Sequence, residues 1–148
     1  EVVREVASQG KPLLGICLGM QMLVDQSEEF GITAGLGLLS GDVVPIPKES
    51  TEGQPTKVPH IGWNSLIPPQ DRDWHGTVLQ KLQPQNAVYF VHSYMVRLTE
   101  PGDQIASCLF EGHSVAAVIG KDNIHGCQFH PEKSGEIGLD VLRQFLLL

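Results

Sequence analysis

The sequence predicts an α/β domain with a mixed sheet, and three features of the chain support this class. A short apolar run, LLGI, precedes a segment of helical composition, and the two together indicate a βα unit. Several β-rich segments then follow one another between residues 87 and 129, and an amphipathic segment closes the chain. With 148 residues and 41% hydrophobic content, the chain is long enough to form a single domain over residues 1–148.

The first elements are expected to be a helix, a buried strand and a second helix. The opening segment, EVVREVASQ, has an apolar helical face that consists of Val2, Val3 and Val6. Gly10 suits the helix C-cap, and Pro12 ends the helix before the next element. Residues 13–16 read as a strand covered on both faces, and residues 18–30, LGMQMLVDQSEEF, read as a helix.

The middle of the chain is rich in Gly, Pro and polar residues between residues 31 and 59. Within it, GDVVPIP is expected to form an edge strand, because prolines are excluded from the centre of a sheet. The segment KESTEGQPTK, residues 48–57, has the composition of a linker.

The second half predicts strands and a terminal helix. Four segments are β-rich, and a KDN turn joins the last two: AVYFVHSYMV, IASCLF, SVAAVIG and IHGCQF. The closing segment, SGEIGLDVLRQFLLL, begins a helix at Ser134 or Gly135. Its apolar stripe consists of Ile137, Val141, Leu142, Phe145 and Leu146.

The composition excludes several classes of function. A net charge of −7 without any basic run argues against nucleic acid or an anionic membrane as the main partner. No apolar run approaches the length of a membrane span, and the first residues lack the layout of a signal peptide. We therefore expect a soluble cytosolic protein whose partners are small molecules or another protein. Three cysteines cannot all pair, which fits a reducing compartment.

Cys17 lies in Gly15-Ile16-Cys17-Leu18-Gly19, which has the form of a strand-to-helix elbow that carries a nucleophile. Such a turn projects the sulfur to a helix N-terminus, where the thiol pKa is lowered, and points the Leu18 N–H toward a developing oxyanion. From this stretch alone, a buried cysteine that acts as a small hydrophobic residue is an equally good interpretation.

His130 and Glu132, in QFHPEKS, are the candidates for the base and for the group that orients it. Pro131 forces His130 toward an extended conformation, in which His130 and Glu132 point to the same side. An exposed histidine beside an unrelated acid is the alternative, which the elbow disfavours.

A zinc site is a further alternative, because His125, Cys127, His130 and Glu132 lie within eight residues. Along a strand, His125 and Cys127 face one side while His130 tends to the other. A cluster of four ligands would therefore need a bulge, and we expect no metal.

GICLGMQ and QFHPEKS together resemble the class I (triad) glutamine amidotransferases, and PHIGWN with YFVHSY is similar to the glutaminase subunits of imidazole glycerol phosphate synthase. The resemblance runs from about Lys11 to the C-terminus. It implies a mixed, mainly parallel sheet flanked by helices, and hydrolysis of glutamine through a cysteine thioester. In it, Cys17 attacks, His130 relays protons and Glu132 orients His130. No metal or organic cofactor is implied.

The resemblance also implies roles for residues around this triad. Five positions match residues that bind the substrate: Gln21, Glu29, His92, Ser93 and Tyr94. Four more match the ammonia exit or the interface with the cyclase subunit: His60, Trp63, Asn64 and Lys133. The expected partner is thus the cyclase subunit, in a heterodimer. A core aromatic is the alternative for Trp63.

Two departures from the family pattern stand out. His125 and Cys127 replace an aromatic and a small or β-branched residue before QFHPE. The family fold also begins with βα units ahead of Glu1, so we expect the chain to be N-terminally truncated and to lack the loop that completes the oxyanion hole. Glutaminase domains of anthranilate or GMP synthases, and a catalytically impaired docking subunit, remain alternatives.

Overall fold

The structure is a computed structural model that describes residues 1–148. Three α-helices, ten strands and two 3₁₀ turns follow one another in this order: α1 (Val2–Ser8), β1 (Leu13–Ile16), α2 (Leu18–Met22), β2 (Gln26–Ser27), β3 (Thr33–Ala34), β4 (Gly41–Pro45), β5 (His60–Ser65), β6 (Ala87–His92), β7 (Tyr94–Leu98), η1 (Pro101–Asp103), β8 (Gln104–Phe110), β9 (His113–Lys121), β10 (Ile124–Cys127), η2 (Pro131–Lys133) and α3 (Gly135–Phe145). No helix is long and apolar enough to cross a membrane.

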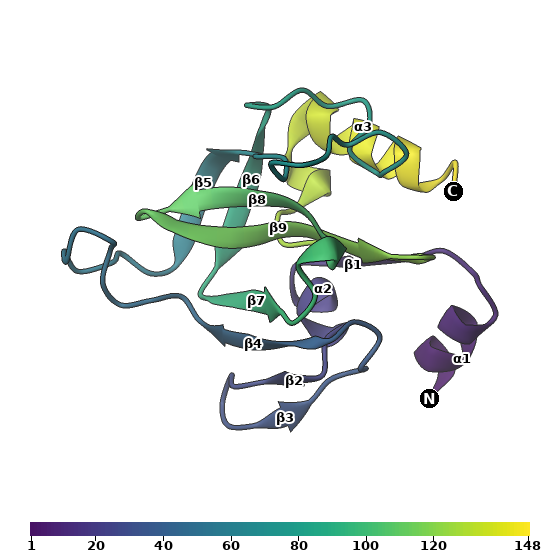
Figure 1. The fold of residues 1–148 in the computed structure, drawn as a ribbon, viewed down its shortest axis with the longest axis horizontal. Helices are drawn as coiled ribbons and strands as arrows, with labels where there is room; N and C mark the ends of the chain where they lie inside the picture. Colours follow the sequence, from purple (N-terminus) through teal and green to yellow (C-terminus); the bar gives the residue numbers. More distant parts are fainter.

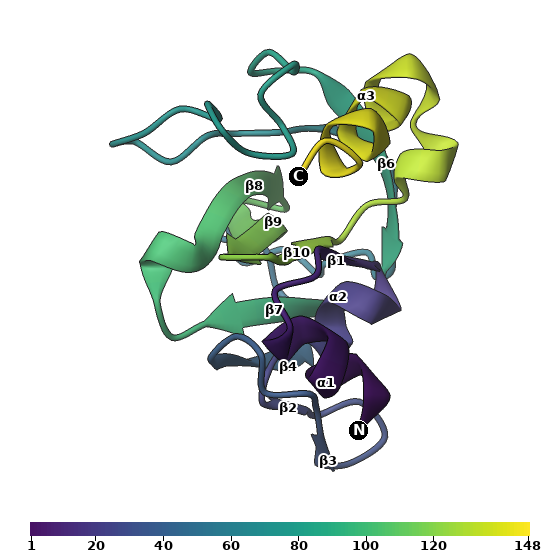
Figure 2. The same ribbon diagram turned by 90° about the vertical axis from the view of Figure 1, so that its right-hand side faces the viewer.

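The central sheet has the strand order β1-β10-β9-β8 and separates two hydrophobic cores. Helix α3 lies on one side of this sheet, while α2 and a second sheet lie on the other (Figure 2). Strand β9 serves both cores, because Val115 and Ala117 belong to one cluster and Ala116 and Ile119 to the other. The side chains of β9 therefore join the two layers into one domain, and their alternation shifts at Val118, where the register with β8 is irregular.

The mixed sheet is confirmed, but antiparallel pairs predominate over the expected parallel ones. Only β1 with β10 and β2 with β4 run parallel. The β9–β10 hairpin explains part of this, since Lys121 pairs with Ile124 across the predicted KDN turn. A tight turn of this kind joins only antiparallel strands.

The second helix is much shorter than the expected span over residues 18–30, because α2 ends at Met22. The carbonyls of Met22, Leu23 and Val24 accept hydrogen bonds from backbone N–H groups in residues 36–39. Those carbonyls are therefore unavailable for a continuing helix. The chain instead forms β2, which pairs with β3 and β4.

The expected edge strand, β4, lies inside the second sheet, whose order is β3-β2-β4-β7. The prediction is therefore wrong for its first half, since Asp42 and Val43 pair with β2 on one side and β7 on the other. Pro45 pairs with β7 alone, so the missing N–H of proline disrupts no ladder on the open side.

The segment expected as one strand over residues 87–96 is divided between two sheets. Strand β6 pairs with β5, and β7 pairs with β4 (Figure 1). Between them, the Ser93 carbonyl accepts a hydrogen bond from the Ile46 N–H at 3.0 Å. His92, Ser93 and Tyr94 therefore lie at the junction of the two sheets.

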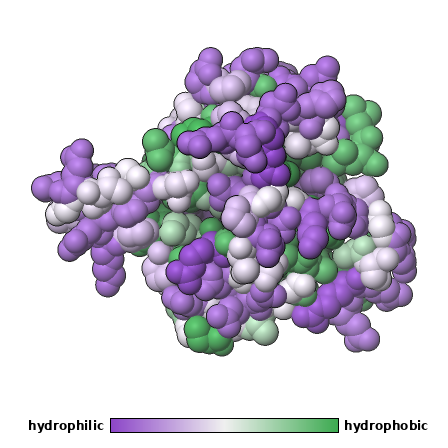
Figure 3. Space-filling model, in the orientation of Figure 1, coloured by the Kyte–Doolittle hydropathy of each residue, from purple (hydrophilic) through white to green (hydrophobic).

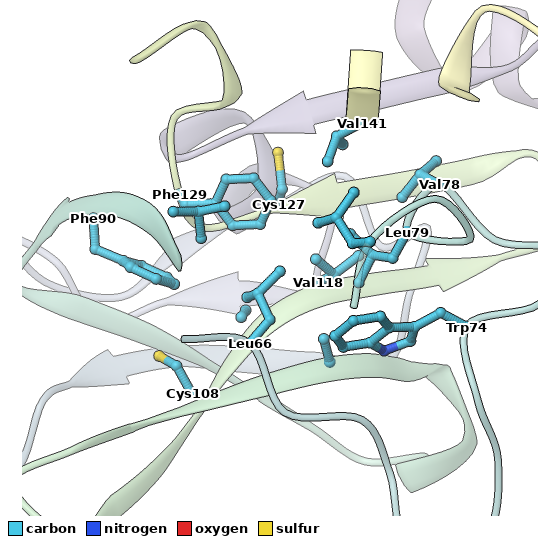
Figure 4. Packing of buried hydrophobic residues seen from close by; sticks show 14 of the residues in the cluster. Leu66, Trp74, Val78, Leu79, Phe90, Cys108, Val118, Cys127, Phe129 and Val141 are labelled. Carbon is cyan, nitrogen blue, oxygen red and sulfur yellow. The ribbon is translucent and has the colours of Figure 1, made fainter. Parts of the chain in front are cut away.

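The long connection between β5 and β6 has little regular structure, yet it fills much of the larger core. Trp74, Val78, Leu79 and Leu82 are buried there against the central sheet and α3 (Figure 4). Trp74 also donates its indole N–H to the Ile105 carbonyl at 3.0 Å. This connection is thus a structural layer of the domain.

Residues 48–57 form an ordered arm, so the expected linker is wrong. Glu49 bridges to Pro55, and the Thr51 N–H donates to the Glu111 carbonyl at 3.1 Å. The arm projects at the left of Figures 1 and 3, and its surface is mainly hydrophilic.

The terminal helix is confirmed, with Ser134 as N-cap residue and Val141 buried. Leu146 lies outside it and is 80% exposed, so its place in the apolar stripe is wrong. At the other end, helix α1 is confirmed, but Val2 and Val3 are exposed and Ala7 is its buried residue.

Candidate active site

Cys17 occupies the predicted elbow between β1 and α2. Its backbone has φ 52° and ψ −107°, a conformation that non-glycine residues rarely adopt. Its N–H donates to the Cys127 carbonyl at 2.8 Å, which holds the turn to β10. A Cβ on Gly15 would lie 2.5 Å from the Gly19 carbonyl oxygen, so only glycine allows β1 and α2 to approach this closely.

The Cys17 thiol lies half-buried between two polar neighbours. Its Sγ donates to the Val91 carbonyl at 3.9 Å, and the Gln128 side-chain Nε2 donates to Sγ at 3.7 Å. Burial raises the pKa of the Cys17 thiol, while the Leu18 N–H and the Gln128 amide act in the opposite direction.

The lowered pKa expected for Cys17 is therefore wrong for this state. Two carboxylates, Glu132 and Glu29, also raise the pKa of this thiol. Because α2 has only five residues, its end offers little to offset burial and these charges. At neutral pH the group is a thiol that needs a base.

His130 and Glu132 form a close pair, with His130 Nδ1 2.6 Å from Glu132 Oε1. A carboxylate only accepts hydrogen bonds, so Nδ1 carries a proton, and in the neutral ring Nε2 is the nitrogen with the free lone pair. The expected extended chain ends at His130, because Pro131–Lys133 is the 3₁₀ turn η2. The pair is thus made across a turn rather than along a strand.

Cys17 and His130 follow two neighbouring parallel strands. Ile16 pairs with Cys127 in the register of β1 and β10, so both residues leave the sheet at the same carboxyl edge. No hydrogen bond joins Sγ to His130 in this structure. Contacts between catalytic groups often tighten only when substrate binds.

A pocket of about 470 Å³ opens beside Cys17. It brings together the five expected substrate residues with four others, since its lining consists of Cys17, Leu18, Gln21, Glu29, Phe30, Val91, His92, Ser93 and Tyr94. Phe30, which is 98% exposed, also lines a second pocket of about 290 Å³, which shares Gln21 and Glu29 with the first. No motif in the sequence singles out Phe30 as a pocket residue.

Gln21 is buried, and its side-chain amide points into the protein. Its Nε2 donates to the Tyr94 carbonyl and to Gln128 Oε1, both at 3.1 Å. Both N–H groups are thus used internally, which leaves Oε1 as the acceptor for a ligand. Gln128 is fully buried; it begins the QFHPEKS segment, but the local sequence does not indicate that its side chain contacts Gln21 and Cys17, which are more than a hundred residues away.

His92 is also buried, and both its ring nitrogens are used inside the protein. Nδ1 donates to the Tyr94 carbonyl at 2.7 Å, and Nε2 lies 3.0 Å from His60 Nδ1. Because Nδ1 of His92 donates, its Nε2 accepts a hydrogen bond from the Nδ1–H of His60. Nε2 of His60 then accepts from the Asn64 side-chain amide, 3.3 Å away. His92 therefore shapes the pocket by holding the Tyr94 backbone.

Both histidines of this pair are kept neutral. Burial lowers the pKa of His60 and that of His92 to about 4; His92 further lowers the pKa of His60, and His130 further lowers that of His92. His60 is further held between the rings of Phe90 and Phe110, whose centroids lie 4.8 and 4.2 Å away.

The expected interface residues lie on β5 and η2. Trp63 is 60% exposed and meets Tyr89 of β6 edge-on, with ring centroids 6.0 Å apart, so it is not a core aromatic. The Tyr89 carbonyl accepts from the His130 N–H at 3.0 Å, which links this face to the candidate base. Lys133 is exposed next to Glu132, and Tyr89 is a further residue that sequence reasoning missed.

The four residues of the alternative zinc site do not converge. His125 packs edge-on against Phe145, Cys127 belongs to the larger core, and His130 pairs with Glu132. No group of three or more His, Cys, Asp or Glu side chains is arranged to hold a metal ion.

Comparison with known proteins places the chain in a family. The model of the family "Glutamine amidotransferase class-I" matches residues 1–148. The chain belongs to the class I glutamine amidotransferases. Its mixed α/β fold, with sheets flanked by helices, is that of the family.

Among curated amidotransferases, the chain is similar to HisH subunits of imidazole glycerol phosphate synthase. It is 48% identical to HisH 1 of Legionella pneumophila (strain Lens) over 99% of the chain and 69% of that protein. It is 50% identical to HisH of Geobacillus sp. (strain WCH70) over 97% of the chain and 65% of that protein. With HisH of Bacillus subtilis the identity is 44%, over 98% and 66% respectively.

Solved amidotransferase structures share the fold. A glutamine amidotransferase from Thermotoga maritima has a TM-score of 0.62 at 17% identity, over 98% of this chain and 51% of its own. A putative GMP synthase component from Thermoplasma acidophilum has a TM-score of 0.61 at 21% identity, over 98% and 60%. The chain thus spans between half and two thirds of these two structures.

The elbow gives a prediction about stability. In Gly15→Ala the new Cβ meets the Gly19 backbone, so we expect α2 to be displaced and the protein to lose about 1–3 kcal/mol of stability. Gly19→Ala is the matched control, because its Cβ meets nothing within 4 Å and alanine favours helix. Denaturant unfolding measures both, and equal stability of the two variants would contradict the argument.

The histidine pair gives a prediction about acid stability. Native His60 and His92 stay neutral down to about pH 4, whereas unfolded histidines take up protons near pH 6.5. The unfolded state therefore binds more protons between these values, and stability should fall as the pH drops from about 6.5 to about 4. Unfolding free energies across this range test it. His75→Asn, at an exposed site, is the control that should leave the slope unchanged.

Proposed function

We propose that this chain hydrolyses glutamine to glutamate and ammonia through a thioester on Cys17, and supplies the ammonia to the cyclase subunit of imidazole glycerol phosphate synthase. The observation that carries the proposal is the parallel β1–β10 edge, which both Cys17 and the His130–Glu132 pair follow, with a pocket that opens beside Cys17. The similarity to HisH subunits supports the same activity.

In the proposed reaction, His130 Nε2 takes the proton of the Cys17 thiol, and Sγ attacks the side-chain amide carbon of glutamine. The resulting oxyanion accepts a hydrogen bond from the Leu18 N–H at the start of α2. His130 then gives its proton to the amide nitrogen, and the tetrahedral intermediate expels ammonia and collapses to the thioester. Water, deprotonated by His130, releases glutamate and restores the thiol.

Glu132 supports this cycle by orientation. Its contact with Nδ1 fixes the His130 tautomer, and its negative charge favours the imidazolium that forms when the thiol proton is taken. The raised pKa of the Cys17 thiol makes this step necessary, because little thiolate exists beforehand at neutral pH.

The proposed substrate orientation follows from the acceptors in the pocket. Glu29 and the free Oε1 of Gln21 offer negative or partly negative oxygens, which suit the α-ammonium group of glutamine. The strand junction at Ser93 runs along the other side of the pocket. The amide end of the substrate would then face Cys17.

The proposed docking face for the cyclase subunit is the outer side of β5 and its neighbours. Three large apolar side chains are exposed there, since Ile61 and Trp63 are each 60% exposed and Leu109 is 55% exposed. Lys133 adds a positive charge on η2, which contacts β6, the strand that carries Tyr89. We expect the heterodimer to act in the cytoplasm.

Two rival assignments are weaker. The likeness to a GMP synthase component is 21% in sequence and concerns the fold alone, whereas HisH subunits reach 44–50% identity. The absence of a hydrogen bond between Sγ and His130 favours a docking subunit without catalysis, and trapping of a thioester formed from glutamine on Cys17 separates the two assignments.

We predict that a diazo-ketone analogue of glutamine alkylates Cys17 before Cys108 and Cys127. Burial raises the pKa of Cys108 to about 12 and raises that of Cys127 as well, so neither forms thiolate at pH 8. Peptide mapping identifies the labelled residue, and Cys17→Ser and His130→Asn should abolish glutamine hydrolysis. Cys108→Ser is the control variant, which should still hydrolyse glutamine. Labelling of Cys108 first, or hydrolysis by Cys17→Ser, would refute the assignment.

A second prediction concerns the partner. Trp63→Ala should weaken binding to the cyclase subunit by about 30-fold or more, because exposed tryptophans at the centre of interfaces typically contribute about 2 kcal/mol or more. Titration calorimetry measures the affinity. Leu147→Ala, also at an exposed apolar site, is the control. If the two variants bind the cyclase subunit with equal affinity, Trp63 is not part of the docking face.

A further inference from the structure

Gln128 is a fully buried amide that touches the nucleophile. It is 0% exposed, and its backbone N–H donates to the Ala117 carbonyl at 2.8 Å, so its position in the sheet region is fixed. Its side chain joins two other groups, since Oε1 accepts from Gln21 at 3.1 Å and Nε2 donates to Cys17 Sγ at 3.7 Å.

The direction of these contacts is set by a backbone carbonyl. The Tyr94 carbonyl only accepts, so the Gln21 atom facing it must be Nε2. The second N–H of that nitrogen then meets Gln128 Oε1, and this turns Gln128 Nε2 toward Sγ. A fixed carbonyl thus determines the orientation of both amides.

We propose that Gln128 is a positioning residue for the nucleophile: its amide holds Cys17 Sγ at one end and the Gln21 side chain at the other. The proposal rests on the glutaminase function argued above. It assigns a role to a residue outside the triad and outside the pocket lining.

The first consequence concerns the sulfur. In the resting state the thiol proton points to the Val91 carbonyl, while the Gln128 N–H points to Sγ. When His130 removes the proton, Sγ loses the bond to Val91 but keeps the Gln128 donor. A donor that faces the sulfur favours the thiolate over the thiol.

The second consequence concerns the substrate side. Because Gln128 Oε1 engages one N–H of Gln21 and Tyr94 the other, the Gln21 amide cannot flip without losing two buried hydrogen bonds. Its Oε1 is therefore presented to the pocket in one orientation, which suits a ligand that donates.

The charged and titratable groups around Cys17 stay the same in the test variants. Glu132 and Glu29 raise its pKa, the Leu18 N–H lowers it, and Cys127 lies close enough to interact. His130 follows the neighbouring strand end. A change in the Cys17 profile between variants at Gln128 can therefore be assigned to the amide.

The test is the pH dependence of Cys17 alkylation by iodoacetamide, measured by peptide mapping in the whole chain. Gln128→Met should raise the apparent pKa of Cys17 by about 0.5–1 unit and slow labelling at pH 7 about three- to tenfold. Gln21→Met keeps the Gln128 amide but removes the hydrogen bond that orients it, so we expect a smaller rise of the Cys17 pKa. If Gln128→Met does not fold, Gln21→Met serves as the test variant.

Gln144→Met is the matched control, because Gln144 is also buried and forms an amide–amide contact with Gln80 in a part of the fold without a hydrogen bond to Cys17. It should leave the profile unchanged. Two results would overturn the proposal. One is that both test variants have the same pH profile of Cys17 labelling as the unmodified chain. The other is that Gln144→Met shifts this profile as much as the test variants do. Alkylation needs no turnover, so failure of the unmodified chain to hydrolyse glutamine would contradict only the proposed function.

Discussion

The parallel pairing of β1 with β10 is the constraint on which the candidate site depends. It brings residues 17 and 130, which are distant in sequence, to one edge of a sheet, and the Cys17 N–H closes the arrangement by donating to the Cys127 carbonyl. Strand β10 is itself held by β9 on its other side, and β9 joins both cores. The positions of Cys17 and of the end of β10, which His130 follows, are therefore set by the most deeply buried part of the domain.

The two ends of the site differ in how strongly they are held. Cys17 has a strained backbone between two elements that approach too closely for any residue but glycine at position 15. His130 is 20% exposed in its side chain and Glu132 49%, on a short 3₁₀ turn. The nucleophile is thus rigid, and the base lies on the more adjustable side, facing the proposed docking surface through Tyr89. Movement of the base toward a fixed sulfur would explain how the contact between Cys17 and His130 forms when substrate binds.

Features encoded by local sequence were predictable, and features made by distant partners were not. The elbow follows from two glycines around Cys17, and the pairing of His130 with Glu132 was predicted, although a 3₁₀ turn and not an extended chain makes it. In contrast, α2 stops at Met22 because carbonyls there bind a segment more than a dozen residues further on. The edge assignment of β4 failed for the same reason, since β2 covers it. Gln128 escaped notice because its partner, Gln21, lies 107 residues away.

The buried polar groups of the site form one continuous hydrogen-bonded series, in which the Tyr94 carbonyl accepts from both directions. Its members, from the β5 face to the sulfur, are Asn64, His60, His92, Tyr94, Gln21, Gln128 and Cys17. Each inner member is buried or partly buried, so breaking one bond leaves a donor or acceptor unpaired at a cost of about 1–3 kcal/mol. The neutral histidines are essential to this series, because a protonated His60 or His92 has no acceptor nitrogen for its neighbour. Burial, which lowers both pKa values, thus keeps the two histidines in the neutral form that the network around the nucleophile requires.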